Sequence, residues 1–174
     1  KTAIKDVQIR NEEPWPDEIM RNLDYYRERR APHYEAVIDF LQIAFAEREV
    51  RLSRFLASLL RKTCEFIGLD VRINPFSESG LALPAVTHPG DWGLQMAKAI
   101  GADTYFNAPG GRKIYDSGKF ESAGIELLFV DPVLPPYPQR RSDFIPGLSI
   151  IDALMWNSPD DVLNMVQGYT LSPC

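Results

Sequence analysis

Two adjacent glycines, Gly110 and Gly111, stand directly before Arg112 and shortly after Thr104–Asn107, a segment whose residues predict a short buried strand. Glycine has no Cβ, so this pair can adopt φ > 0 and let a ligand approach the backbone, and the first N–H groups of a helix that follows favour an anion. In an α/β sheet such a turn lies at the carboxyl ends of the strands, where ligands bind. The pattern therefore predicts a ligand site, and the alternative is a tight strand-to-helix connection without a ligand.

A proline-rich arm, residues 132–138, leads to further polar side chains at Tyr137, Gln139 and Arg140. Its prolines favour a stiff, extended path of about 3 Å per residue, so seven residues span roughly 20 Å. Gln139 has donor and acceptor groups for a hydroxyl-rich ligand, and Tyr137 offers an apolar face to a sugar ring. We expect the arm to reach the Asn107–Arg112 turn, and the alternative is that it only crosses the surface.

Candidate catalytic groups are a histidine and an aspartate. His88 lies near the end of segment 74–90, which also contains Ser77 and Ser79, and Asp116 follows the glycine turn. A loop of this length in a compact domain is often functional. An enzyme needs a base or nucleophile that faces the pocket, for which His33, His88, Asp116 and Asp152 are the candidates, whereas a binding protein needs only neutral hydrogen-bonding groups. We therefore predict catalytic roles for His88 and Asp116 and ligand contacts for the two serines.

The predicted pocket combines these groups. Asn107 and Gln139 are expected to hydrogen-bond the ligand, and Arg112 or Arg140 to offer charge to a phosphate or carboxylate. The glycine pair would supply a backbone nest for the same ligand.

Composition limits the classes of function. The chain has 174 residues, of which 45% are hydrophobic and 25% charged, as expected for one globular domain. A net charge of −5 argues against a nucleic-acid partner. The two cysteines provide neither a disulfide framework nor a zinc spacing, so we expect a reducing cytoplasm, no metal site and no assignable cofactor. The absence of a long apolar run predicts no direct membrane insertion, and a small molecule is the expected partner.

The spacing of apolar residues predicts the elements that position these groups. Helices are expected over residues 14–30, 34–47, 50–68, 92–100 and 148–156, with a last one starting at 158. Strands are expected over residues 69–73, 104–107 and 125–130. Because strands and helices alternate, we predict an α/β fold with a parallel-sheet, Rossmann-like core. The whole chain, 1–174, would be one domain with a mainly helical part over residues 10–68 and an α/β part over residues 69–174.

Two serines predict helix starts near the end of the chain. Ser149 with Asp152 three residues later resembles a capping box, and Ser158 precedes Pro159 and two acids. We therefore expect Ser149 and Asp152 to be a helix cap rather than catalytic groups.

Four motifs follow one another in the chain: GADTYFNAPGGRKIYD at 101–116, FESAGI at 120–125, YPQ at 137–139 and LSIIDAL at 148–154. In these motifs the chain resembles the WbqC-like family of bacterial proteins, best over about residues 65–157. The resemblance implies an association with surface polysaccharide and O-antigen synthesis. We therefore expect a transferase-type enzyme that acts on a sugar or activated, nucleotide-linked sugar precursor. The alternative is a non-catalytic ligand-binding or assembly protein of the same pathway. The first residue is not Met and the family's N-terminal strand is not seen, so we expect a preceding segment to be missing.

Overall fold

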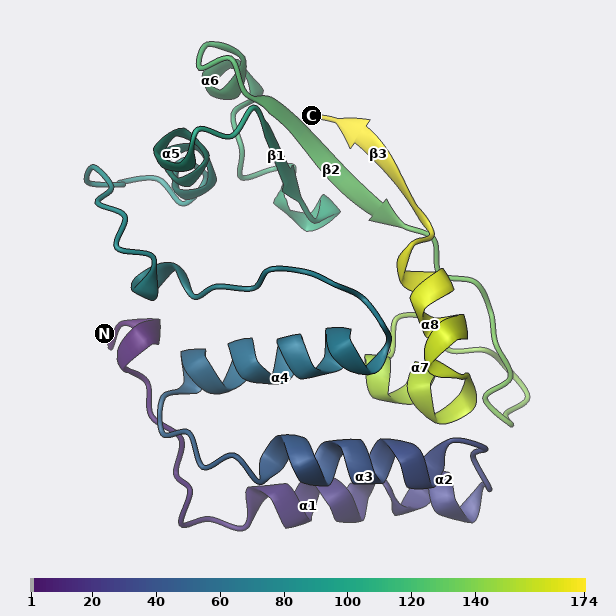
Figure 1. Ribbon diagram of the computed structural model, residues 1–174. Coiled ribbons are helices and arrows are strands. Elements are labelled where there is room, and N and C mark those ends of the chain that lie inside the picture. Colours follow the sequence, from purple (N-terminus) through teal and green to yellow (C-terminus); the bar gives the residue numbers. More distant parts are fainter. Residues whose placement is uncertain (1) are drawn as a thin grey trace. The chain divides into compact units, whose positions relative to one another are not determined.

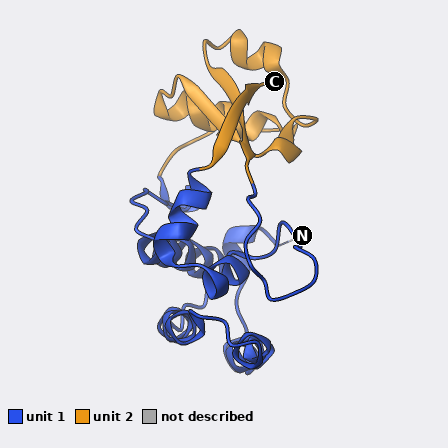
Figure 2. Ribbon diagram, turned by 90° about the vertical axis from the view of Figure 1, so that its right-hand side faces the viewer, with its two compact units in different colours: residues 1–79, 134–167 blue, residues 80–133, 168–174 orange. Residues whose placement is uncertain are grey.

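The computed structural model describes residues 2–174 and divides the chain into two compact units, which Figure 2 shows in different colours. Unit 1 contains the chain up to Ser79 together with Leu134–Gln167, and unit 2 contains Gly80–Val133 and Gly168–Cys174. Residues 134–167, which were expected in the α/β part, lie in unit 1.

Unit 1 is helical (Figure 1). Its elements are η1 (Ile4–Asp6), α1 (Trp15–Asn22), α2 (Asp24–Glu28), α3 (Tyr34–Phe45), α4 (Leu52–Phe66), η2 (Phe76–Glu78), α7 (Ile150–Trp156) and α8 (Pro159–Val166), where η denotes a 3-10 helix. The helix expected over residues 14–30 is interrupted at Leu23, which keeps right-handed helical backbone angles, and the other predicted helices of this unit are confirmed with shorter bounds. No helix in residues 2–174 is long and apolar enough to cross a membrane.

The core of unit 1 explains why α7 and α8 belong to it. Val37 and Leu41 lie one turn apart on α3, and both are buried in one cluster with Leu154 and Met155 of α7 and Val162 of α8. Full burial of such side chains contributes about 1.5–3 kcal/mol each relative to exposure. The apolar face of α3 is therefore covered by residues more than a hundred positions later in the chain.

The strand expected over residues 69–73 is not formed. Helix α4 ends as predicted at Gly68, whose φ is 75°, and the N–H of Leu69 donates to the carbonyl of Cys64 at 2.8 Å. The segment that follows has no strand partner among the described residues, and the carbonyl of Ile73 accepts instead from the Arg61 side chain. An alternating pattern becomes a strand only where a neighbouring strand offers its backbone groups, so this prediction was wrong.

Unit 2 contains a small mixed sheet with two helices. Its elements are α5 (Asp91–Ile100), β1 (Thr104–Asn107), η3 (Pro109–Gly111), α6 (Ser117–Glu121), β2 (Glu126–Pro132) and β3 (Tyr169–Pro173). The sheet order is β1-β2-β3, with β1 and β2 parallel and β2 and β3 antiparallel. The parallel pair is confirmed, whereas β3 was not predicted. The fold is mixed α/β, and a Rossmann-like parallel core is not confirmed.

The sheet buries one face against the two helices of its unit. Leu127 and Phe129 point to the same face of β2 because they are two residues apart, and they share a core cluster with Leu94 and Ala97 of α5 and Phe120 of α6. Tyr105 of β1 packs against the same cluster. This packing holds the carboxyl end of β1, and with it Asn107, in a fixed position.

Candidate functional site

Three side chains around the glycine turn form a neutral hydrogen-bond network in unit 2, which we call the Asn107 cluster. Asn107 donates from Nδ2 to the hydroxyl of Tyr115 at 2.7 Å and to the hydroxyl of Tyr105 at 3.1 Å. The two hydroxyls are themselves 3.1 Å apart. Burial, and next the hydrogen bond to Tyr105, raise the pKa of Tyr115 to about 12. The phenol of Tyr115 is therefore protonated at neutral pH and acts by hydrogen bonding.

The glycines of the turn do not have the predicted backbone. Gly110 and Gly111 lie in η3 and neither has φ > 0, because a 3-10 turn uses right-handed angles and the N–H of Gly111 donates to the carbonyl of Ala108. The next α-helix starts only at Ser117. Glycine is required at 111 by close contact: a Cβ there would lie 2.8 Å from Asn107 Oδ1, whereas one on Gly110 would meet nothing within 4 Å. The expected positive φ was therefore wrong, and ligand contacts by the two glycines stay a prediction.

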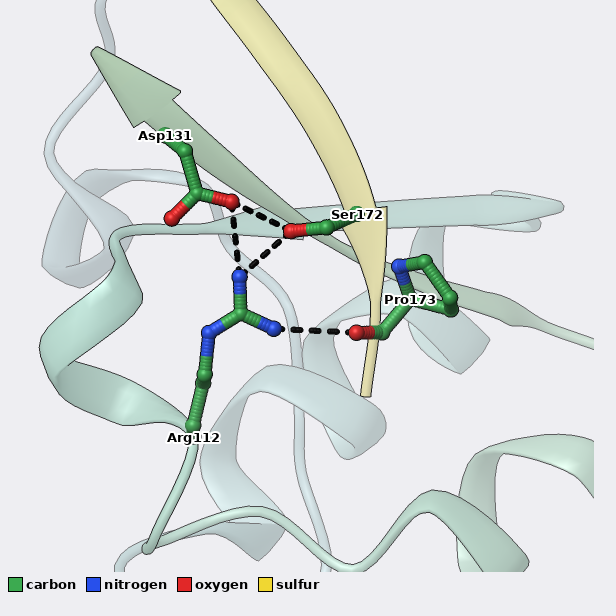
Figure 3. Close-up of polar contacts among 4 residues, drawn as sticks. All are labelled: Arg112, Asp131, Ser172 and Pro173. Atoms are coloured by element: carbon green, nitrogen blue, oxygen red, sulfur yellow. Dashed lines mark hydrogen bonds and ion pairs between the residues drawn. The ribbon is translucent and has the colours of Figure 1, made fainter.

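Arg112 has partners for its charge within unit 2, as Figure 3 shows. Its Nη2 donates to Asp131 at 2.7 Å and to the hydroxyl of Ser172, and its Nη1 donates to the carbonyl of Pro173 at 2.9 Å. Hydrogen bonding by Ser172, and next by Arg112, lowers the pKa of Asp131. The guanidinium also lies over the ring of Phe129, 4.5 Å from its centroid. Arg112 thus fastens β3 to β2, and binding a phosphate would require it to leave these partners.

The two predicted catalytic groups, also in unit 2, have local partners. Asp116 is the N-cap of α6 and accepts from the N–H of Gly118 at 3.0 Å and of Lys119 at 3.4 Å. His88 accepts through Nδ1 from the N–H of Gly90 at 3.2 Å, in the turn before α5. Asp116 also lines a shallow hollow of about 610 Å³ between α5 and α6. Their catalytic roles stay predictions.

The predicted serines belong to unit 1. Ser77 lies in η2 and Ser79 directly after it, and both are exposed. The hydroxyl of Ser79 donates to the carbonyl of Phe76 at 2.8 Å, and Glu78 between the serines pairs with Arg54 of α4. Ligand contacts by either serine stay a prediction.

A second group of side chains, which we call the Asp152 cluster, forms in unit 1. Asp152 is 5% exposed and accepts from the hydroxyl of Tyr26 at 2.8 Å, from the hydroxyl of Tyr137 at 2.7 Å and from Nε2 of Gln139 at 2.9 Å. Gln139 is 4% exposed and exchanges hydrogen bonds with the backbone of Ile145 at 3.0 and 2.8 Å. No basic side chain among the described residues forms an ion pair with Asp152. A buried carboxylate is therefore held by neutral donors alone.

The two phenols of this cluster are held in their protonated form. Burial, and next the hydrogen bond to Asp152, raise the pKa of Tyr137 to about 12 and raise that of Tyr26 as well. The predicted capping box of Ser149 and Asp152 is half wrong. Ser149 does cap α7 by accepting from the N–H of Ile151 at 3.3 Å, but the Asp152 side chain turns into the cluster instead.

Strained and unsatisfied groups accompany the Asp152 cluster. Arg140 has φ of 48° and Arg30 has φ of 53°, and they are the non-glycine residues with positive φ in residues 2–174. Arg140 donates to the carbonyl of Arg29 at 2.8 Å, while Arg29 donates back to the carbonyl of Arg140 at 3.2 Å. The Arg140 guanidinium lies 6.0 Å from the ring centroid of Trp156, whose buried Nε1 has no hydrogen-bond partner. Backbone strain of this kind concentrates at functional sites.

Four of the predicted site residues fall into two groups. Asn107 and Gly111 belong to the Asn107 cluster, and Tyr137 and Gln139 belong to the Asp152 cluster. One pocket shared by both groups stays a prediction. Tyr26 was missed, because it stands 126 positions before Asp152 and no local pattern joins the two. The signal that could have found the cluster is the pair of motifs at 137–139 and 148–154, which meet at Asp152.

The chain belongs to the WbqC-like protein family, whose sequence model matches residues 1–164. The match extends the resemblance seen in the four motifs to the helices of the first half. It supports, at the level of the family, a role in a polysaccharide-associated pathway. The curated proteins and the solved structures contain no match to this chain. In the described part of the chain, histidine, cysteine, aspartate and glutamate form no group that could hold a metal ion.

Proposed function

From its place in the WbqC-like protein family, we propose that this protein is a transferase-type enzyme of bacterial surface polysaccharide and O-antigen synthesis. Its substrate is a sugar or an activated, nucleotide-linked sugar precursor, and it works in the cytoplasm. The Asp152 cluster is the part of the substrate site that the geometry supports best. His88 and Asp116 are the proposed acid–base groups.

The observation that carries this proposal is a carboxylate buried without a cation. Burying a charge that has no opposite charge is unfavourable, and three neutral donors compensate it only in part. Asp152 and Gln139 are the buried polar or charged side chains of residues 2–174. A buried carboxylate that neutral donors hold without a cation is unusual in a core, which supports a role for the cluster beyond packing.

The geometry suggests how the cluster would act on a sugar. The Tyr137 hydroxyl donates its proton to Asp152 at 2.7 Å, which leaves an oxygen lone pair that can accept from another hydroxyl. Its pKa of about 12 keeps the phenol neutral at physiological pH. Tyr137 is therefore a positioning group for a neutral, hydroxylated ligand and not a base.

Calorimetric titration with UDP-N-acetylglucosamine, GDP-mannose and dTDP-glucose tests the proposal. We expect one of them to bind with a dissociation constant of about 1 μM to 1 mM. Asp152→Asn should weaken that binding at least tenfold, and Asp39→Asn, an exposed acid of α3, should leave it unchanged. Binding of none of the three would contradict the proposal.

A non-catalytic binding or assembly protein of the same pathway is the second candidate. The observation in its favour is that both proposed acid–base groups already have local partners: Asp116 caps α6 and His88 closes a turn. In that case the clusters would recognise a sugar without transferring it.

Substitutions at Asp116 separate the two candidates. Serine is also a good N-cap, so Asp116→Ser should keep the melting temperature while it removes the carboxylate. With an acceptor sugar added, an enzyme that uses Asp116 transfers the sugar to an acceptor hydroxyl or to water and releases the nucleotide, and Asp116→Ser would lose this release, which chromatography measures. A binding protein would show no such release in the unchanged chain, and the affinity of Asp116→Ser for the ligand would equal that of the unchanged protein.

A further inference from the structure

Unit 1 contains a hollow of about 480 Å³ between the proline-rich arm and α8. The arm side is lined by Pro135, Pro136, Tyr137 and Pro138, and the helix side by Asn157, Asp161, Asn164 and Met165. Figure 1 shows α7 next to α8, and α8 leads into β3. A hollow of this size is within the range of small-molecule sites.

The arm side is apolar and rigid. Proline has a fixed φ and no backbone donor, so a row of prolines forms a wall whose shape changes little. Tyr137 adds an aromatic ring whose hydroxyl donates to buried Asp152, and whose centroid lies 5.1 Å from that of Phe144 in a T-shaped arrangement. Asp152 and Phe144 therefore fix the orientation of the Tyr137 ring in the absence of a ligand.

The helix side carries hydrogen-bonding groups with unused capacity. Asn157 donates from Nδ2 to the carbonyl of Ala153 at 2.8 Å, which leaves its Oδ1 without a partner among the described residues. Asp161 uses Oδ2 for the capping box with Ser158, so its Oδ1 is left without a hydrogen-bond partner among the described residues. Asn164 is exposed and forms no hydrogen bond within the described part of the chain. Amide and carboxylate oxygens in this arrangement accept hydrogen bonds from hydroxyl groups.

We propose that this hollow binds the sugar ring of the substrate, with the ring's apolar face on Tyr137 and the prolines and its hydroxyls on Asn157, Asp161 and Asn164. The carboxylate of Asp161 disfavours a phosphate here, so the group recognised is the neutral sugar and not the nucleotide diphosphate. This inference rests on the proposed function. Of the residues to which it assigns the sugar, only Tyr137 was predicted from the sequence to contact a ligand.

Amide NMR spectra of the full chain, titrated with UDP-N-acetylglucosamine, GDP-mannose and dTDP-glucose and separately with UDP, test the assignment. We expect one sugar conjugate to shift the side-chain amide signals of Asn157 and Asn164, and UDP alone to leave them in place. Asn164→Ala should weaken binding of that conjugate at least tenfold. Asn22→Ala, at an exposed asparagine of α1, should not change it.

The outcomes separate this inference from the proposed function. Binding that shifts other residues and survives Asn164→Ala would overturn the hollow as the sugar site while the proposed function stands. Shifts of Asn157 and Asn164 with UDP alone would overturn the choice of sugar over nucleotide. An absence of binding by all three conjugates would overturn both proposals.

Discussion

Each unit contains a hydrogen-bonded cluster built from two tyrosine hydroxyls and one side-chain amide, but the group at the centre of the cluster differs. In unit 1 the centre is the Asp152 carboxylate, which accepts from Tyr26, Tyr137 and Gln139. In unit 2 the centre is a neutral amide, Asn107, which donates to both of its tyrosines.

A carboxylate only accepts, so every donor around Asp152 has one fixed direction. Hydroxyls around an amide donor can exchange roles with each other, as the contact between Tyr105 and Tyr115 allows. Similar residues therefore form two kinds of cluster. The Asp152 cluster fixes the direction of every hydrogen bond around a charge, whereas the Asn107 cluster packs around the end of β1 and lets its hydroxyls exchange donor and acceptor roles.

The largest effect is expected from Asp152→Ala, which breaks the charged centre. Three donors lose their acceptor, and although water can reach the half-buried tyrosines, Gln139 stays buried. We expect a loss of about 3 kcal/mol in the free energy of unfolding, measured by urea denaturation. Asp39→Ala, at an exposed acid, should change it by less than about 0.5 kcal/mol. A loss for Asp152→Ala no larger than for Asp39→Ala would show that the cluster does not hold unit 1 together.

A smaller effect is expected from Gly111→Ala, which crowds the neutral centre. The new Cβ would lie 2.8 Å from Asn107 Oδ1, so the network must shift, at about 2 kcal/mol of overpacking. Gly110→Ala is the matched control, because a Cβ there meets nothing within 4 Å and the backbone needs no positive φ. Equal melting temperatures for the two variants would contradict the contact-based role of Gly111.

A still smaller effect is expected from Asn107→Asp, which gives unit 2 a carboxylate centre like that of unit 1. Both tyrosine hydroxyls can turn to donate to a carboxylate, so we expect a loss of only about 1 kcal/mol. The tyrosinate absorbance of the variant should appear at higher pH than in the unchanged protein, because a nearby negative charge raises a phenol pKa. A loss as large as that of Asp152→Ala would mean that the donor role of Asn107 cannot be replaced.

The smallest effect is expected from high pH, since the tyrosine hydroxyls are partly exposed. The folded pKa of Tyr137, about 12, lies above its ordinary value of 10, so the protonated phenol is favoured by folding. Its contribution is complete below about pH 10 and is lost as the pH rises through 12. Urea denaturation at several pH values should show this decline, and Tyr137→Phe should make it shallower. An unchanged slope in that variant would exclude Tyr137 as a source.

Local patterns predicted most of the helices and the parallel strand pair. Gly68 ends α4 and Gly101 ends α5 with positive φ, and Ser158 forms a capping box, because these signals act within a few residues. Strand β3 could not be predicted this way, since its partner β2 lies about forty positions earlier and the pairing depends on the whole fold.

The Asp152 cluster was predicted only in part. Tyr137 and Gln139 were selected for their chemistry and they do lie in a polar cluster, but Asp152 at its centre was interpreted as a helix cap. A carboxylate three residues after a serine matches a capping box whether or not its side chain turns toward the backbone. That choice is made by Tyr26 and Tyr137, which tertiary packing brings to Asp152, so the cap pattern alone could not decide it.

The pairing of β2 with β3 also determines an order of events during synthesis on the ribosome. Helices α7 and α8 lie between these strands in the chain, so the sheet of unit 2 is completed only after the last helices of unit 1 have been made. Until then one edge of β2 has free backbone groups, and Arg112 has neither Ser172 nor Pro173 to contact. Any folding of unit 2 before that point would therefore leave a strand edge unpaired, and β3 would cover it.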